Sequence, residues 1–125
     1  ASVPMTPAGY EALFSGLSSI EIPMLFWGGG KDELTAMEWS VLPLYEGITS
    51  KKILVELPQA GHYTFTNACD ILPAYDDCGD GFIPPQDAHV IINEITTAFL
   101  AKQLGYKGWE DSLPMGSDDL IWSEN

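Results

Sequence analysis

The sequence of 125 residues predicts a single domain with an α/β fold. Two continuous apolar runs, at residues 21–27 and 52–57, have the length of strands and are apolar at most positions. A helical pattern over residues 35–44 separates them, and a long amphipathic pattern follows over residues 85–104. A strand, a helix and a second strand at this spacing indicate a βαβ unit with parallel strands.

The beginning of the chain gives the weakest signals. Residues 1–9 contain two prolines and are predicted to form an irregular lead-in, and residues 10–17 are predicted to form a short helix. The first strand, 21–27, stops at the glycines 28–30. Because its apolarity is continuous rather than alternating, we expect it to be buried on both faces, as in a parallel sheet.

The middle of the chain carries clearer boundaries. Thr35 followed by Glu38 has the spacing of a capping box, which predicts Thr35 as the N-cap of the helix at 35–44. The second strand, 52–57, is stopped by Pro58. Residues 58–83 then form a long loop, and loops of this length inside a compact domain are usually functional.

The predicted helix at 85–104 begins with prolines and is followed by Gly105. Its apolar side chains recur at three- and four-residue steps, so one stripe of the helix should face a sheet. Residues 106–125 are predicted to be an acidic tail in which Trp109 and Trp122 are candidate anchors.

Two parallel strands are too few for a self-sufficient sheet, because a two-stranded sheet is marginal in water. Both predicted strands are apolar on both faces and therefore require neighbouring strands. The sequence reveals no such neighbours, which indicates a chain that completes its sheet with residues from elsewhere.

The charge balance excludes several classes of partner. Eighteen acidic residues against five basic ones give a formal net charge of −13. Binding to nucleic acid needs cations that displace the counterions of phosphates, so we expect no nucleic-acid partner. The same charge opposes docking on anionic membranes, and no run of about 20 apolar residues predicts a membrane span.

Asp32 and His62 are the residues best placed for chemistry. Asp32 follows the first strand through a glycine turn, and His62 follows the second strand through Ala60-Gly61. Because parallel strands end at the same edge of a sheet, the two side chains should approach each other. A carboxylate beside an imidazole fixes the tautomer of the ring and stabilises its charged form, which is the acid and base part of a nucleophilic triad.

These segments resemble the α/β-hydrolases, in particular secreted dienelactone-hydrolase-like and platelet-activating-factor-acetylhydrolase-like esterases. In that superfamily the triad acid lies in a Gly-x-x-Asp turn and the triad base follows a glycine after the last strand. Here the matching residues are Gly29-Gly30-Lys31-Asp32 and Ala60-Gly61-His62, and His62 to Thr66 resemble the segment after the base. The resemblance covers about residues 10–104 and implies hydrolysis of a carboxylic ester without a cofactor or metal.

One departure from the family pattern decides what this chain does alone. The family's nucleophile lies in Gly-x-Ser-x-Gly before the acid, and no such motif occurs here; Gly16-Leu17-Ser18-Ser19-Ile20 lacks the second glycine. The resemblance therefore implies that residues 1–125 are the C-terminal part of an α/β-hydrolase domain. We expect the serine and the oxyanion hole on an N-terminal segment or companion chain, and we expect the isolated chain to be inactive.

Cys69 and Cys78 are predicted to form a disulfide, which favours a secreted or periplasmic protein over a cytosolic one with two reduced thiols. The chain begins with Ala1 rather than Met, so we expect a processed or cut product. Two other classes stay open at this point. Asp76, Asp80, Gly81 and Asp87 fall at positions 1, 5, 6 and 12 of a calcium loop, which Cys78 at position 3 spoils. The chain could also be a non-catalytic interaction fragment with an exposed strand edge.

Overall fold

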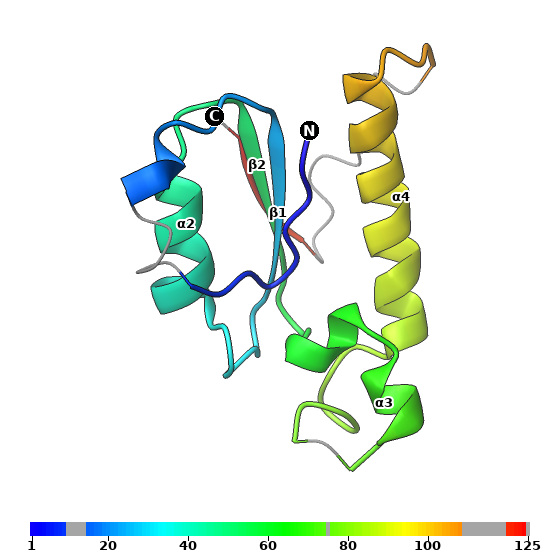
Figure 1. Ribbon diagram of the computed structural model, residues 1–125. Coiled ribbons are helices and arrows are strands. Elements are labelled where there is room, and N and C mark those ends of the chain that lie inside the picture. Colours follow the sequence, from blue (N-terminus) through cyan, green and yellow to red (C-terminus); the bar gives the residue numbers. More distant parts are fainter. Residues whose placement is uncertain (10–14, 75, 109–119, 125) are drawn as a thin grey trace.

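The computed structural model describes residues 1–9, 15–74, 76–108 and 120–124. Its elements pack as a small sheet between helices (Figure 1). In chain order they are β1 (Met24–Gly29), a π-helical turn η1 (Met37–Val41), α2 (Leu42–Gly47), β2 (Lys52–Leu57), a 3₁₀ turn η2 (His62–Phe65), α3 (Ala68–Ile71), α4 (Pro85–Gln103) and β3 (Ile121–Glu124).

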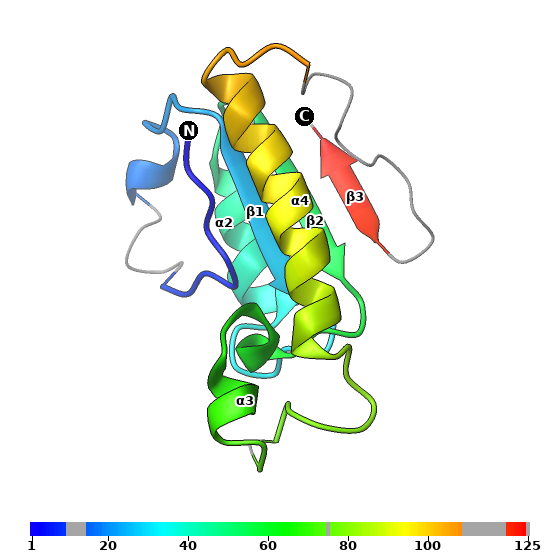
Figure 2. The same cartoon turned by 90° about the vertical axis from the view of Figure 1, so that its right-hand side faces the viewer.

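The sheet has the order β1-β2-β3. β1 and β2 are parallel, with Met24 opposite Lys52 and Gly29 opposite Leu57, so both strands end at the same edge. β3 is antiparallel to β2. Helix α2 covers one face of the sheet and α4 the other, while α3 lies beyond the carboxyl ends of β1 and β2 (Figures 1 and 2). The predicted α/β class and the parallel strand pair are confirmed at this level.

Both faces of the β1–β2 pair are buried, as the continuous apolar runs predicted. All six residues of β1 are buried. Alternate side chains of β1 and β2 pack against α4 in one cluster and against η1 and α2 in the other. The α4 side contains Leu25, Trp27, Ile53, Val55, Ile92, Ile95 and Phe99. The α2 side contains Phe26, Leu54, Met37, Val41, Leu44, Tyr45 and Ile48.

The predicted irregular lead-in is wrong in part, because its first residues run beside β1. Ser2 pairs with Met24 and Met5 with Trp27, both in parallel orientation. The backbone N–H of Leu25 donates to the Ser2 carbonyl, and that of Thr6 donates to the Trp27 carbonyl, at 3.0 and 2.9 Å. Prolines at positions 4 and 7 hid this pairing from a pattern-based prediction, because proline lacks the N–H of a strand residue.

The acidic tail also contains a strand that the sequence analysis missed. In β3, Trp122 pairs with Val55 and its side chain, partly buried, packs against the α4-side core. This agrees with the predicted anchoring role of Trp122, whereas Trp109 lies outside the described residues. The lead-in and β3 supply one neighbour each for β1 and β2, so the expectation that this chain lacks neighbouring strands is wrong.

Three predicted boundaries need correction. The first strand begins at Met24 rather than at residue 21 and includes Gly28 and Gly29. The helix at 35–44 begins only at Met37, and Ala36 is its N-cap with no side-chain capping bond, so the predicted Thr35 cap is wrong. Of the predicted helix at 10–17, residues 15–17 are helical and the rest lie outside the described residues.

Helix α4 matches its prediction closely. It begins with Pro85 and ends at Gln103, with Leu104 as C-cap. Gly105 follows with φ +76°, a left-handed conformation that glycine adopts without strain. The predicted stripe is buried at Ala88, Ile92, Ile95, Ala98 and Phe99.

Candidate functional site

The two turns that follow β1 and β2 are joined through their backbones. The Gly30 N–H donates to the Leu57 carbonyl and the Lys31 N–H to the Ala60 carbonyl, both at 2.9 Å. A Cβ atom at Gly29 would lie 2.5 Å from the Ala60 carbonyl oxygen, inside van der Waals contact. Glycine at this position therefore permits the close approach of the two turns.

Asp32 is the centre of this site. Its side chain is fully buried. Oδ1 accepts hydrogen bonds from the backbone N–H groups of Leu34 at 2.9 Å and Thr35 at 2.7 Å. Oδ2 accepts the Thr35 hydroxyl proton at 2.8 Å and lies 3.0 Å from His62 Nδ1. Each carboxylate oxygen thus has two partners, which compensates for its removal from water.

His62 is the first residue of η2, directly after the turn that follows β2. The Gly61 N–H donates to Thr64 Oγ1 at 3.0 Å and fixes the start of this turn. The imidazole presents Nδ1 to Asp32, and its side chain is 27% exposed. Nε2 has no hydrogen-bond partner within the described part of the chain. A buried carboxylate on one ring nitrogen and an open second nitrogen are what a general base requires.

The predicted approach of Asp32 and His62 is therefore confirmed by the geometry, whereas their catalytic roles stay predictions. Two neighbours were missed. Thr35 contacts both members of the pair, and its pattern with Glu38 had suggested a helix cap instead. His89, on α4, has Nε2 3.0 Å from the Thr64 carbonyl and so links α4 to η2. Its position near the start of a helix gave no signal for this contact.

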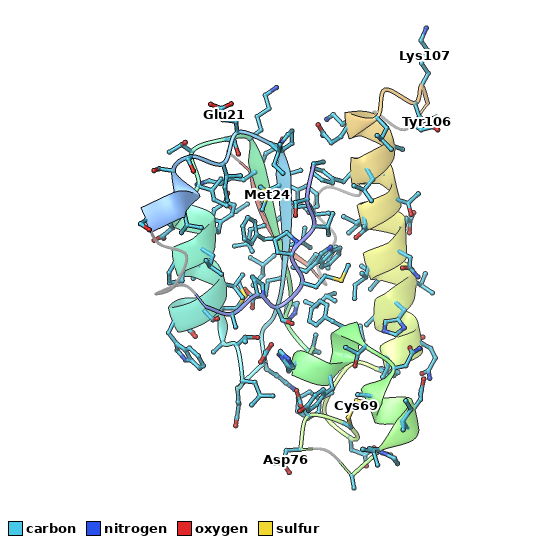
Figure 3. All side chains as sticks on the ribbon, in the orientation of Figure 1. Glu21, Met24, Cys69, Asp76, Tyr106 and Lys107 are labelled. Atoms are coloured by element: carbon cyan, nitrogen blue, oxygen red, sulfur yellow. A yellow bond between two sulfur atoms is a disulfide. The ribbon has the colours of Figure 1, made fainter. Side chains whose placement is uncertain are left out.

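The predicted disulfide is present: Cys69 on α3 is bonded to Cys78. Figure 3 shows Cys69 and Asp76 at the end of the molecule where β1 and β2 finish, opposite Glu21. Next to the disulfide, Asp77 Oδ2 accepts a hydrogen bond from the Tyr63 N–H at 3.2 Å. The disulfide loop is therefore hydrogen-bonded to the turn that carries His62.

The residues that follow the disulfide also contact the turn that leads to Asp32, called the acid turn below, and the turn after β2. Lys31 Nζ donates to the Gly81 carbonyl, and its charge lies 5.6 Å from the centre of the Phe82 ring. The Ile83 N–H donates to the Gln59 carbonyl at 2.8 Å. We call residues 76–83 the clasp, because they contact both turns at the carboxyl ends of β1 and β2.

A cavity of about 380 Å³ opens between the clasp and the two turns. Its lining residues are Lys31, Glu33, Leu34, Tyr63, Asp76, Asp77 and Phe82. Three of these adjoin Asp32 or His62 in the sequence. A larger cavity of about 660 Å³ lies between the clasp, the end of β2 and α4, and neither Asp32 nor His62 lines it. Neither Asp32 nor His62 lines the smaller cavity either, but it is the one of the two whose lining includes the sequence neighbours of the pair, Lys31, Glu33 and Tyr63.

Glu56 lies under the acid turn and is partly withdrawn from water. Burial raises the pKa of the Glu56 carboxyl above its usual value, and repulsion from Glu38 raises it further. A Cβ at Gly30 would lie 2.8 Å from Glu56 Oε1, so this carboxyl packs directly against the turn that leads to Asp32.

Within the described residues, no three His, Cys, Asp or Glu side chains are grouped so that they could hold a metal ion. In the same part of the chain, no helix combines the length and apolarity needed to cross a bilayer.

Comparison of the sequence with models of known protein families and with curated proteins gives no match.

Proposed function

We propose that this chain supplies the acid and the base of a Ser-Asp-His triad in a carboxylic ester hydrolase of the α/β-hydrolase type. Asp32 is the acid and His62 the base. The serine and the oxyanion donors come from a further segment of the protein or from a companion chain. The observation that carries this proposal is the 3.0 Å contact between the buried Asp32 carboxylate and His62 Nδ1.

The geometry supports a defined sequence of proton transfers. With Nδ1 directed at Asp32, His62 Nε2 takes the proton of the serine hydroxyl as its oxygen attacks the ester carbonyl. The imidazolium then gives this proton to the departing alkoxide, which leaves an acyl-enzyme. Water attacks the acyl-enzyme by the same route and releases the acid and the free serine. Asp32 stays ionised and stabilises the imidazolium throughout.

The edge of the sheet beside β1 supports the participation of a further segment. In the strand-like lead-in, Ser2, Pro4 and Thr6 direct their backbone groups at β1. Val3 and Met5 therefore direct their N–H and C=O groups outward, where the described residues offer them no hydrogen bond. An unpaired edge of this kind accepts another strand, and a strand added there in parallel orientation would end at the same edge as Asp32 and His62.

The disulfide supports an oxidising compartment, and we infer that the protein is secreted or periplasmic. Cys78 lies within the clasp and is joined to Cys69, so oxidation and the arrangement of the site are linked.

The proposal is tested by assaying the protein, isolated from its source with any bound chain, on a short-chain nitrophenyl ester. A fluorophosphonate probe should label one serine, and mass spectrometry should place that serine outside residues 1–125. Asp32→Asn and His62→Ala should each lower kcat/KM by at least about 10³-fold. Asp80→Asn, at an exposed position, is the matched control and should keep full activity.

Two results would contradict the proposal. One is turnover that His62→Ala leaves unchanged, because the base would then lie elsewhere. The other is a protein that neither hydrolyses esters nor reacts with the probe, which would favour an interaction fragment.

A further inference from the structure

Two oxygen atoms lie within hydrogen-bond distance of His62 Nδ1, and one of them belongs to neither member of the acid–base pair. Thr35 Oγ1 lies 2.8 Å from Asp32 Oδ2 and 3.0 Å from His62 Nδ1. Asp32 Oδ2 itself lies 3.0 Å from Nδ1. The hydroxyl oxygen, the carboxylate oxygen and the ring nitrogen thus form a nearly equilateral triangle.

The number of protons available decides the roles within this triangle. A threonine hydroxyl has one proton to donate and two lone pairs that accept, whereas an ionised carboxylate only accepts. The Thr35 proton goes to Asp32 Oδ2, so the oxygen of Thr35 faces Nδ1 as an acceptor. Nδ1 therefore faces two acceptors and must carry the proton, which leaves Nε2 with its lone pair.

The opposite tautomer, in which Nδ1 carries no proton, is unfavourable for the same reason. If the Thr35 hydroxyl donated to a bare Nδ1, Asp32 Oδ2 would lose both of its donors. It would also face the lone pair of Nδ1 at 3.0 Å, with no proton between them. The charge of a buried carboxylate makes such a loss costly.

The position of Thr35 is fixed by the same carboxylate. Its backbone N–H donates to Asp32 Oδ1 at 2.7 Å, and the residue is 7% exposed. Two hydrogen bonds to the Asp32 carboxylate, one from the backbone N–H and one from the hydroxyl, therefore hold Thr35 in place. Glu38, whose spacing to Thr35 suggested a capping box, takes no part, because the helix begins with Ala36 as its cap.

We propose that Thr35 is a positioning residue that holds His62 in the Nδ1–H tautomer and so keeps Nε2 free to act as a base. The tautomer depends only on the contacts above. Its consequence for turnover depends on the function proposed in the preceding subsection.

The tautomer is measured directly by ¹⁵N NMR of the imidazole in the isolated protein. The measurement is made at about pH 9, where an ordinary imidazole is neutral. His62 signals are assigned as those lost in His62→Gln. The wild-type ring should show a protonated Nδ1 and an unprotonated Nε2. Thr35→Val, which keeps the shape and removes the hydroxyl, should lower the ratio of the Nδ1–H to the Nε2–H form about five-fold. Thr35→Ser should restore it.

A wild-type protein with the proton on Nε2 overturns the proposal, whatever the variants do, and so does a Thr35→Val ratio equal to that of wild type. If Thr35→Val fails to fold, Thr35→Ala, which also lacks the hydroxyl, replaces it and should show the same lowered ratio; a wild-type ratio in Thr35→Ala overturns the proposal.

The rate of ester hydrolysis is a second, independent measurement of the effect of Thr35. In the esterase assay, Thr35→Val should lower kcat about ten-fold with KM unchanged, and Thr35→Ser should recover most of it. A protein without esterase activity would contradict the proposed function but leave the tautomer result standing.

Discussion

Removing the disulfide is predicted to destabilise the protein by about 2–3 kcal/mol. Cys69 and Cys78 are nine positions apart, so the bond closes a loop of about ten residues in the unfolded chain. The double variant Cys69→Ala/Cys78→Ala restores the entropy of that loop to the unfolded state. With an unfolding entropy of about 2.1 cal/mol/K per residue, a chain of 125 residues should lose about 10 °C in Tm.

Thermal unfolding followed by circular dichroism measures this shift. A reductant should lower the Tm of the wild type by the same amount and leave the double variant unchanged. Ile71→Ala, at a side chain that is 74% exposed on the same helix as Cys69, is the matched control and should stay within about 0.5 kcal/mol of wild type. A double variant whose Tm lies within about 2 °C of wild type would refute the loop-entropy reasoning.

Three further perturbations address the residues around the site. Glu56→Gln should raise the free energy of unfolding at pH 7 by less than about 1 kcal/mol, seen as a higher Tm, and the gain should vanish near pH 4, because a raised pKa destabilises the fold only where Glu56 is ionised. Gly29→Ala should cost about 1–3 kcal/mol in urea unfolding through overlap with the Ala60 carbonyl, whereas Gly16→Ala, with open space around it, should be neutral or stabilising. His89→Ala should cost about 1 kcal/mol, measured in the same way, through loss of the bond to Thr64. Wild-type stability of Gly29→Ala or of His89→Ala would contradict the explanation given for that variant.

Patterns that depend on burial were predictable from the sequence. Continuous apolar runs predicted β1 and β2, because in a strand that is buried on both faces polar residues at alternate positions would also be buried. The approach of Asp32 and His62 followed from parallel pairing alone, since both residues come directly after strands that end at one edge. These inferences use only the direction of the strands and need no side-chain detail.

Two kinds of feature could not be predicted from the sequence: the choice of a polar group between alternative hydrogen-bond partners, and strands with weak sequence signals. Thr35 satisfies the spacing of a helix cap, yet its hydroxyl proton goes to Asp32 Oδ2 because a buried carboxylate is the stronger acceptor. β3 has four residues within an acidic tail, which is too short for its alternation to stand out. The start of the chain pairs with β1 through carbonyl groups that proline retains, and a prediction based on propensity disregards them.

The backbone bonds between the two turns have a consequence for how such a protein can diversify. Gly30 and Lys31 hold the acid turn to the base turn through main-chain amides and carbonyls, so the spacing of the pair does not depend on which side chains line the cavity. Substitutions at Glu33, Leu34 or Tyr63 change the polarity and size of the cavity wall and leave those bonds in place. The geometry of the pair is therefore kept by the main chain, and the side chains that line the cavity can change independently of it.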